Sequence, residues 1–301
     1  MSFMLLGILN AQAASATGSP FFVSVGNSGD LTTSSDGTSW TLQTSGFSTT
    51  TIRCVSYGDG LYVAGGGSGK VSTSPDGINW TARTSNLGAS EDVFGVAYND
   101  ALYVAAGGQF NTSSGLSSSP DGITWTARTS GFGSNRVLGL GAGNGLFVAV
   151  GDSGTVTTST DGTSWTSRTS GFGTTRIYGS FYGDGVYVIC GDAGKISSST
   201  NGTSWTSRTS GFGSGRVQAG AYGDSLYVVG GADGKVSTSP DGTTWTLRTT
   251  GFGSTQIQAA AYGDGLFVIG GESGRLETSP NGITWTSRTS ATSNNINGLT
   301  R

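Results

Sequence analysis

Three equally spaced arginines are the side chains of this 301-residue sequence best placed to bind a charged group. Arg136, Arg176 and Arg216 lie 40 residues apart. Guanidinium groups bind carboxylates through paired hydrogen bonds, so three of them brought together could hold an anion or an acidic sugar. Copying of a repeated sequence would produce the same spacing without any ligand. The sequence leaves both interpretations open.

Catalytic chemistry has few candidates in the chain. No His is present, which excludes His-based acid–base and triad chemistry. Glu occurs only at Glu91, Glu272 and Glu277, and no carboxylate pair stands outside the repeated pattern, as a glycosidase would need. Residues 151–154 (Gly-Asp-Ser-Gly) match the nucleophile motif of trypsin-type proteases, but they occupy a repeated turn and have no His base. We predict no enzymatic activity, no cofactor and no metal site.

A repeat places these residues, and the tryptophans mark its register. They lie 40 residues apart except for one interval of 45 residues, at Trp40, Trp80, Trp125, Trp165, Trp205, Trp245 and Trp285. In the clearest copy, residues 217–249, β-prone runs at 217–222, 226–229, 235–239 and 245–249 alternate with turns rich in Gly and Asp. Each copy is therefore predicted to be a four-stranded antiparallel meander. Such units are typical of β-propeller blades, so we predict an all-β, seven-bladed β-propeller.

The first copy lacks its innermost strand. Residues 21–25, 31–34 and 40–44 match the second, third and fourth strands, whereas residues 296–301 lie where a further innermost strand would begin. We predict that this C-terminal strand completes blade one, which closes the ring and removes free sheet edges. Residues 19–301 then form one propeller domain.

The longer interval contains an insertion in the second turn of the third copy. It covers residues 107–115 and includes Gln109, Phe110 and Asn111. The alternatives are neutral drift in a tolerant hairpin and a binding loop. Strand direction predicts that these residues lie at the same end of the ring as Arg136, Arg176 and Arg216, so they are the candidate ligand-binding residues.

A second arginine ladder follows the tryptophans by three residues from the second copy onward. For this ladder we predict hydrogen bonding or stacking between blades. Its members are Arg83, Arg128, Arg168, Arg208, Arg248 and Arg288.

Composition limits the partners. Charged residues make up 11% of the chain and the net charge is −3, which disfavours a nucleic-acid partner. Cys54 and Cys190 fall in distant blades, so we expect both thiols to be unpaired.

The N-terminal 18 residues do not match the repeat. Their apolar side chains require burial, and we predict a docking peptide and tether that anchors the chain to other protein chains or to copies of itself. A signal peptide and a disordered tail are the alternatives, and the apolar run is too short to span a membrane. The anchoring residues are Phe3, Met4, Leu5, Leu6, Ile8 and Leu9.

The third turn of every copy resembles the Asp-box, also called the BNR repeat. Residues 74–80 (Ser-Pro-Asp-Gly-Ile-Asn-Trp) and 239–245 (Ser-Pro-Asp-Gly-Thr-Thr-Trp) follow its Ser/Thr-x-Asp-(x)-Gly-x-Thr-Trp pattern in the shorter spacing, with Asn79 in place of the Thr in the first of them. The resemblance implies a structural turn between the third and fourth strands, in which the Asp accepts backbone N–H bonds and the Trp packs between blades. The Asp positions are Asp36, Asp76, Asp121, Asp161, Asn201, Asp241 and Asn281, with Asn replacing Asp in two copies.

A second resemblance concerns function. Residues 1–14 are similar to short N-terminal leaders of tailed-bacteriophage virion proteins. We therefore expect a non-enzymatic virion surface protein, a decoration or fibre component, that is anchored by its N-terminal peptide and adheres to host surface glycans. The alternatives are a sialidase-like glycan-processing enzyme and a secreted bacterial sugar-binding propeller.

Overall fold

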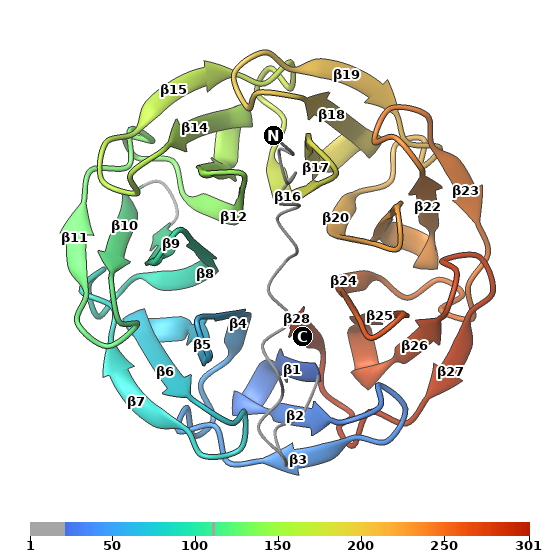
Figure 1. Ribbon diagram of the computed structural model, residues 1–301, viewed down its shortest axis with the longest axis horizontal. Helices are drawn as coiled ribbons and strands as arrows, with labels where there is room; N and C mark the ends of the chain where they lie inside the picture. The colour runs from blue at the N-terminus through green and yellow to red at the C-terminus, as the bar shows by residue number, and fades with distance from the viewer. Residues whose placement is uncertain (1–21, 110–111) are drawn as a thin grey trace, which may run out of the picture.

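Seven four-stranded antiparallel sheets surround a central axis in the computed structural model, which describes residues 22–109 and 112–301 (Figure 1). Each sheet is one blade, and the chain passes through the blades in sequence order. The predicted all-β, seven-bladed propeller is confirmed. The predicted docking peptide with its six anchoring side chains lies outside the described residues, as do Phe110 and Asn111.

The strands fall into four concentric sets. The innermost set is β4 (Ile52–Gly58), β8 (Asp92–Asn99), β12 (Val137–Gly143), β16 (Ile177–Gly183), β20 (Val217–Gly223), β24 (Ile257–Gly263) and β28 (Ile296–Thr300). The second set is β1 (Phe22–Gly26), β5 (Leu61–Gly66), β9 (Leu102–Gln109), β13 (Leu146–Gly151), β17 (Val186–Gly191), β21 (Leu226–Gly231) and β25 (Leu266–Gly271). The third set is β2 (Leu31–Ser34), β6 (Lys70–Ser74), β10 (Ser113–Ser119), β14 (Thr155–Ser159), β18 (Lys195–Ser199), β22 (Val236–Ser239) and β26 (Leu276–Ser279). The outermost set is β3 (Thr41–Gln43), β7 (Thr81–Thr84), β11 (Thr126–Arg128), β15 (Thr166–Thr169), β19 (Thr206–Thr209), β23 (Thr246–Arg248) and β27 (Thr286–Arg288).

Short 3-10 turns join the second and third strands in six blades. They are η1 (Asn27–Gly29), η2 (Gly67–Gly69), η3 (Asp152–Gly154), η4 (Asp192–Gly194), η5 (Ala232–Gly234) and η6 (Glu272–Gly274). No helix among the described residues is long and apolar enough to cross a membrane.

The C-terminal strand closes the ring. β28 pairs with β1 in antiparallel register, with Ser24 opposite Leu299, so the two ends of the described chain share blade one (Figure 1). Side chains reinforce the junction, because Asn294 Nδ2 donates to Asp30 Oδ2 at 3.0 Å and the Thr292 hydroxyl donates to the same carboxylate. The predicted closure of blade one is confirmed.

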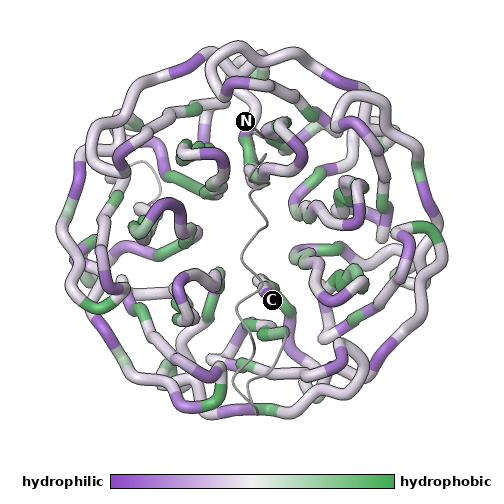
Figure 2. Tube along the Cα trace, in the orientation of Figure 1, coloured by the Kyte–Doolittle hydropathy of each residue, from purple (hydrophilic) through white to green (hydrophobic). Residues whose placement is uncertain are grey.

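The hydrophobic core lies between neighbouring blades. Second strands are buried on both faces, as Val228 and Val229 of β21 show with no exposed surface. Trp40 of blade one packs with Phe22 of its own blade and Val268 of blade seven. The hydropathy trace shows the hydrophobic segments mainly on the inner strands (Figure 2). A propeller of this kind is therefore stabilised by its blade interfaces.

The tryptophans end the third turns, and each outermost strand begins one residue later. Within these turns the Asp or Asn oxygen accepts backbone N–H bonds, such as those from Ile123 and Thr124 to Asp121 at 2.8 Å. Asn201 accepts the equivalent pair at 2.9 and 3.0 Å. The following glycine, Gly122 after Asp121, has φ near +68°, a conformation that side-chain-bearing residues rarely adopt.

The insertion in blade three extends a hairpin. β9 and β10 have 8 and 7 residues, against 6 and 5 in blade two, and Gly107 pairs with Gly115 in the ladder. Within the expected loop, residues 107–109 and 113–115 are therefore strand, because they continue the pairing of β9 with β10. Gln109 is the exposed last residue of β9.

Candidate functional site

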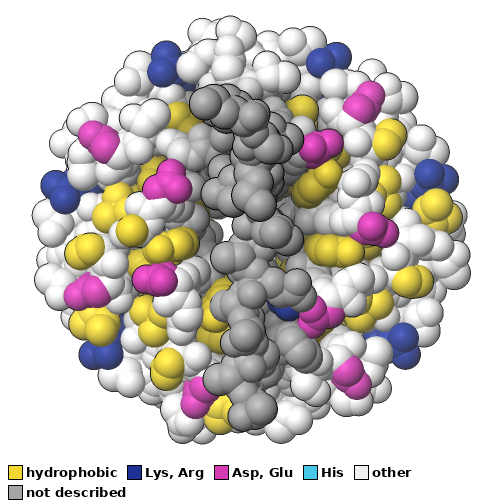
Figure 3. Space-filling model, viewed as in Figure 1, with side chains coloured by type: hydrophobic (Ala, Val, Ile, Leu, Met, Phe, Trp, Pro, Cys, Tyr) yellow, Lys and Arg dark blue, Asp and Glu magenta, His cyan; other side chains and the backbone are white. Residues whose placement is uncertain are grey.

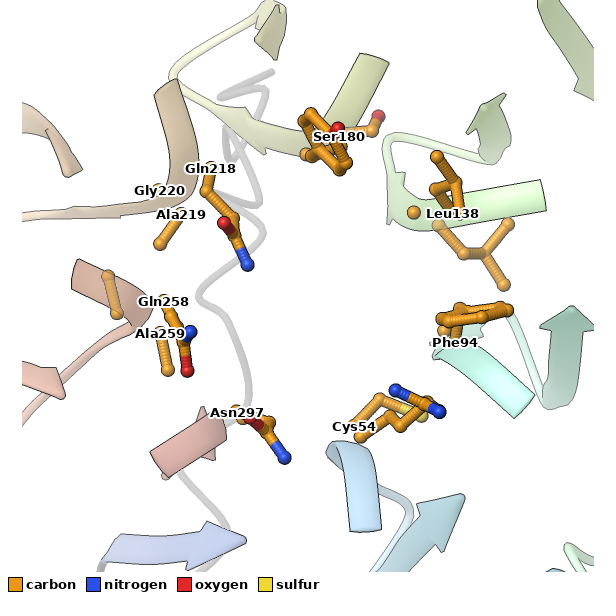
Figure 4. A pocket seen from close by; sticks show the side chains of 18 of the residues that line it. Cys54, Phe94, Leu138, Ser180, Gln218, Ala219, Gly220, Gln258, Ala259 and Asn297 are labelled. Carbon is orange, nitrogen blue, oxygen red and sulfur yellow. The ribbon is translucent and has the colours of Figure 1, made fainter. Parts of the chain in front are cut away.

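One side chain from each blade points into the central channel. These side chains occupy equivalent places in the innermost strands, where the pairing register shifts by one residue at a β-bulge, as between Ile52 and Cys54. A bulge leaves one residue outside the ladder and re-aims its side chain. The seven residues line a cavity of about 490 Å³ (Figure 4) and are Arg53, Phe94, Leu138, Tyr178, Gln218, Gln258 and Asn297. This volume is in the range of small-molecule sites.

Arg136, Arg176 and Arg216 line the same cavity. Each immediately precedes an innermost strand, β12, β16 or β20, so the three enter the channel at one end. Their side chains are 19%, 40% and 37% exposed, and the cavity therefore opens to solvent at this end. Gln109 is not among the lining residues, so the structure does not bring it into the cavity with the arginines.

Aspartates of the 3-10 turns bind these arginines. Asp152 lies between two of them, with its Oδ2 at 2.9 Å from Arg136 Nε and its Oδ1 at 3.0 Å from Arg176 Nε. Asp192, the equivalent residue of the next blade, lies 2.9 Å from Arg216 Nε and accepts the Tyr178 hydroxyl at 3.1 Å. Two guanidinium groups share the single carboxylate of Asp152, so positive charge is in excess where blades four and five meet.

Aromatic rings support the arginine side of the cavity. The guanidinium carbons of Arg53 and Arg136 lie 4.9 and 5.6 Å from the centre of the Phe94 ring, and that of Arg216 lies 4.4 Å from the Tyr178 ring. Such contacts stabilise cations away from bulk water. Burial raises the pKa of Tyr178, and its hydrogen bond to Arg176 raises the pKa of that guanidinium, so Arg176 remains charged.

Sequence reasoning missed Arg53 in this group. It lies two residues after the position equivalent to Arg176, inside the bulge of β4, and pairs with Asp92 of the next blade at 2.6 Å. Only the strand register identifies its side chain as facing the channel.

Amides line the wall of the cavity that blades six, seven and one form. Gln218, Gln258 and Asn297 point inward from blades six, seven and one (Figure 4). Gln256 donates to the Gln218 side chain, and Asn297 Nδ2 donates to Ile52 O at 2.9 Å. Amide groups both donate and accept, so this side can bind hydroxyl groups.

Three buried polar atoms around the cavity have no hydrogen-bond partner among the described residues. They are Arg53 Nε, Ser180 Oγ and Gln258 Oε1, from blades two, five and seven. An unsatisfied buried polar atom costs roughly 1 to 3 kcal/mol. Water or a polar ligand inside the cavity would satisfy these atoms.

The comparisons with known proteins place the chain among propellers. Residues 74–212 match the model of the DUF6242 beta propeller domain. No curated protein matches the sequence significantly. The fold is a seven-bladed β-propeller.

Solved propellers of distant sequence share this shape. A structure of YCF48 bound to D1 peptide is 19% identical with a TM-score of 0.61, covering 79% of this chain and 80% of its own. YCF48 from Cyanidioschyzon merolae is 15% identical with a TM-score of 0.62, covering 81% and 87%. A streptogramin B lyase is 12% identical with a TM-score of 0.73, covering 83% and 86%. At these identities the likeness concerns the fold alone.

Proposed function

We propose that this propeller is a non-enzymatic binding protein of a bacteriophage virion surface, and that the arginine end of its channel binds an acidic sugar of host glycans. The observation that carries the ligand proposal is one cavity that is lined by both guanidinium groups and amides. An acidic sugar presents a carboxylate and several hydroxyls, which suit these two kinds of group. The seven hydrogen-bonded turns support the narrower proposal that the chain is an Asp-box propeller.

The carboxylates at the cavity support binding without turnover. Asp92, Asp152 and Asp192 each contact an arginine at 3.0 Å or less. A glycosidase needs a pair of carboxyl groups that face the scissile bond, whereas these carboxylates are each bound by a guanidinium group. These three side chains therefore serve to position the arginines.

The ligand proposal is tested by replacing the arginines that share Asp152. Losing a charge-assisted hydrogen bond costs roughly 1.5 to 3 kcal/mol, so R136Q and R176Q should each weaken binding of an acidic oligosaccharide by about tenfold or more. Titration calorimetry with an oligosaccharide and its neutral analogue measures the effect.

Lys195→Gln is the matched control, because it also removes one positive charge but lies outside the residues that line the cavity. It should bind as the unmodified protein does. Equal binding by R176Q and the unmodified protein would exclude the channel as the site. Sugar release that disappears in D152N would favour the glycan-processing enzyme instead.

The virion proposal rests on the apolar N-terminal sequence. Mass spectrometry of purified virions and of culture supernatant should find the full-length chain in virions. A chain found only in the supernatant, and cleaved after Ala13, would favour a secreted sugar-binding protein.

A further inference from the structure

Six arginines on the outermost strands form a ring at the outer edge of the disc, which we call the rim arginines. Basic side chains are spaced around this edge in Figure 3. One rim arginine comes from each blade except blade one, and all six are half-buried. They are Arg83, Arg128, Arg168, Arg208, Arg248 and Arg288.

Among the described residues, each rim arginine makes one hydrogen bond, and its partner lies in the same blade. Nε donates to a Ser or Thr hydroxyl of the adjacent third strand, as from Arg128 to Ser118 at 2.8 Å and from Arg168 to Thr158 at 2.9 Å. The other four bonds follow the same pattern. The hydrogen-bonding alternative of the prediction is therefore wrong, because the Ser and Thr hydroxyls that accept these bonds belong to the same blade as the arginine.

Blade one shows that this hydrogen bond does not require a charge. Gln43 occupies the equivalent position and donates from Nε2 to Thr33 Oγ1 at 3.0 Å. A neutral amide thus satisfies the same acceptor in the same place. The arginines of the other six blades therefore add a positive charge that this hydrogen bond does not need.

That charge faces solvent without a counterion. No rim arginine forms an ion pair with any residue in 22–109 or 112–301. None of their terminal nitrogens is both buried and without a hydrogen-bond partner. By contrast, four channel arginines are held by aspartates. The rim arginines are therefore available to an anionic partner, and exposed Ser and Thr side chains flank them on the outermost strands.

We propose that the rim arginines bind a flexible anionic polysaccharide that runs along the edge of the disc. Single exposed ion pairs are weak, so binding must come from several blades acting together. A flat membrane would touch a circular edge only at neighbouring blades, so most of the rim arginines could not contact it at the same time. Duplex DNA, with a persistence length of about 50 nm, is too stiff to follow a domain whose radius of gyration is roughly 20 Å without a large bending cost.

Single-stranded nucleic acid is flexible, but it requires aromatic surfaces on which bases stack. Among the described residues, the large hydrophobic side chains that are exposed are aliphatic, and the tryptophans that precede the rim arginines are buried or half-buried between blades. The exposed aliphatic side chains are Leu42, Ile78, Ile123, Leu247 and Ile283. A sugar polymer needs hydroxyl and charge partners, and the rim provides both. This site is separate from the channel and uses none of its residues.

The test uses the full-length protein with Arg128, Arg168 and Arg208 of three consecutive blades changed to Gln. Since Gln43 supports the same hydrogen bond, the variant should keep its melting temperature. Its affinity for two polyanions, alginate with carboxylates and heparin with sulfates, is measured against salt concentration. The slope of log affinity against log salt should fall by roughly one for each arginine removed, as for other polyelectrolytes.

A second triple variant, K70Q/K195Q/K235Q, makes the same change in net charge at lysines that lie outside the outermost strands and bind carbonyl oxygens of Phe47, Phe172 and Phe212. It should bind both polymers as the unmodified protein does. Equal loss in the two variants would show that net charge alone drives binding and would overturn the proposal. Unchanged binding by the rim variant, or equally tight binding of single-stranded DNA, would overturn it as well. Replacing the same three arginines with Lys should restore most of the affinity. Channel variants such as R176Q should leave polymer binding unchanged, which separates this site from the proposed sugar site.

Discussion

The smallest unit that recurs in this protein is a hydrogen-bonded turn around one Asp or Asn oxygen. N–H groups of Thr124 and Ile123 lower the pKa of Asp121 from 3.8 to about 2. The same bonds form around Asn201. The accepting oxygen is therefore what holds the turn, because an uncharged Asn oxygen makes the same bonds as a charged Asp oxygen.

Substitutions at Asp121 separate these two contributions. D121N should change the free energy of unfolding at pH 7 by less than about 1 kcal/mol, whereas D121A, which removes the acceptor, should cost roughly 1 to 2 kcal/mol. Chemical denaturation of both variants measures the difference. Equal stability of D121A and the unmodified protein would show that the turn does not need its side-chain acceptor.

Acid should weaken the turns that contain Asp. A carboxyl whose pKa is lowered in the folded state stabilises the protein above its unfolded pKa, near 3.8, and this stabilisation is lost as the pH falls towards 2. Melting temperatures between pH 5 and 2 should therefore fall less steeply for D121N than for the unmodified protein. If the melting temperatures of D121N and the unmodified protein fell equally with pH, the Asp121 carboxylate would not be a group through which acid destabilises the protein.

Burial of the tryptophans is uneven, and their energetic contributions should follow it. Trp125 is 3% exposed within the interface of blades two and three, whereas Trp165 is only half-buried. W125A should cost roughly 3 to 5 kcal/mol, and W165A should cost less because part of its ring already contacts water. If both variants lost the same free energy of unfolding in urea, the exposed fraction of the tryptophan ring would not determine the cost of its removal.

Among the elements, β28 has the largest structural consequence, because it is the only innermost strand supplied from the other end of the sequence. Ile296 and Leu299 pack in the core between blades one and seven. Arg301 extends this packing over Gly263 and pairs with Asp264 at 2.7 Å. The strand therefore joins the first and last blades through both its backbone and its side chains.

Deleting residues 296–301 should leave β1 as an exposed edge and cause aggregation or a large fall in melting temperature. The milder I296A should cost roughly 2 to 5 kcal/mol without changing the oligomeric state. Light scattering and thermal melting distinguish these outcomes. A deletion variant that stays monomeric and equally stable would contradict closure by this strand.

For the molecule as a whole, the ring form means that every blade has two neighbours and that the hydrophobic core of the repeats is buried between them, while single aliphatic side chains such as Leu42 and Ile123 remain exposed. Acidic and hydrophobic side chains are both scattered over the visible face of the disc (Figure 3). Assembly with other proteins is then expected to depend on residues outside the blades.

A shortened chain that starts at Ser19 tests this expectation. It should fold as a monomeric propeller but fail to join the virion or to oligomerise, because burial of the removed apolar side chains could contribute roughly 1.5 to 3 kcal/mol each. Analytical ultracentrifugation and virion co-sedimentation are the measurements. Normal assembly of the shortened chain would place the anchor on the propeller.

The sequence by itself determined the number of blades, the strand order and the closing strand. Tryptophan spacing, Gly-containing turns and the missing first strand are local or periodic features, and they depend on backbone chemistry within about 40 residues. For the same reason the turns around Asp121 and its equivalents were predictable from residue type. The end of the channel that holds Arg136, Arg176 and Arg216 followed from strand direction alone.

Only the tertiary structure decided what surrounds those arginines. Asp152 binds two of them because curvature of the ring places neighbouring blades side by side, and no spacing along the chain shows that one carboxylate is shared. Arg53 and Gln258 face the cavity because a β-bulge shifts the register by one residue, a geometric choice that residue types do not reveal. The rim arginines donate to hydroxyls of the third strand in their own blades, as Arg128 does to Ser118, and the structure rather than the sequence decided this partner.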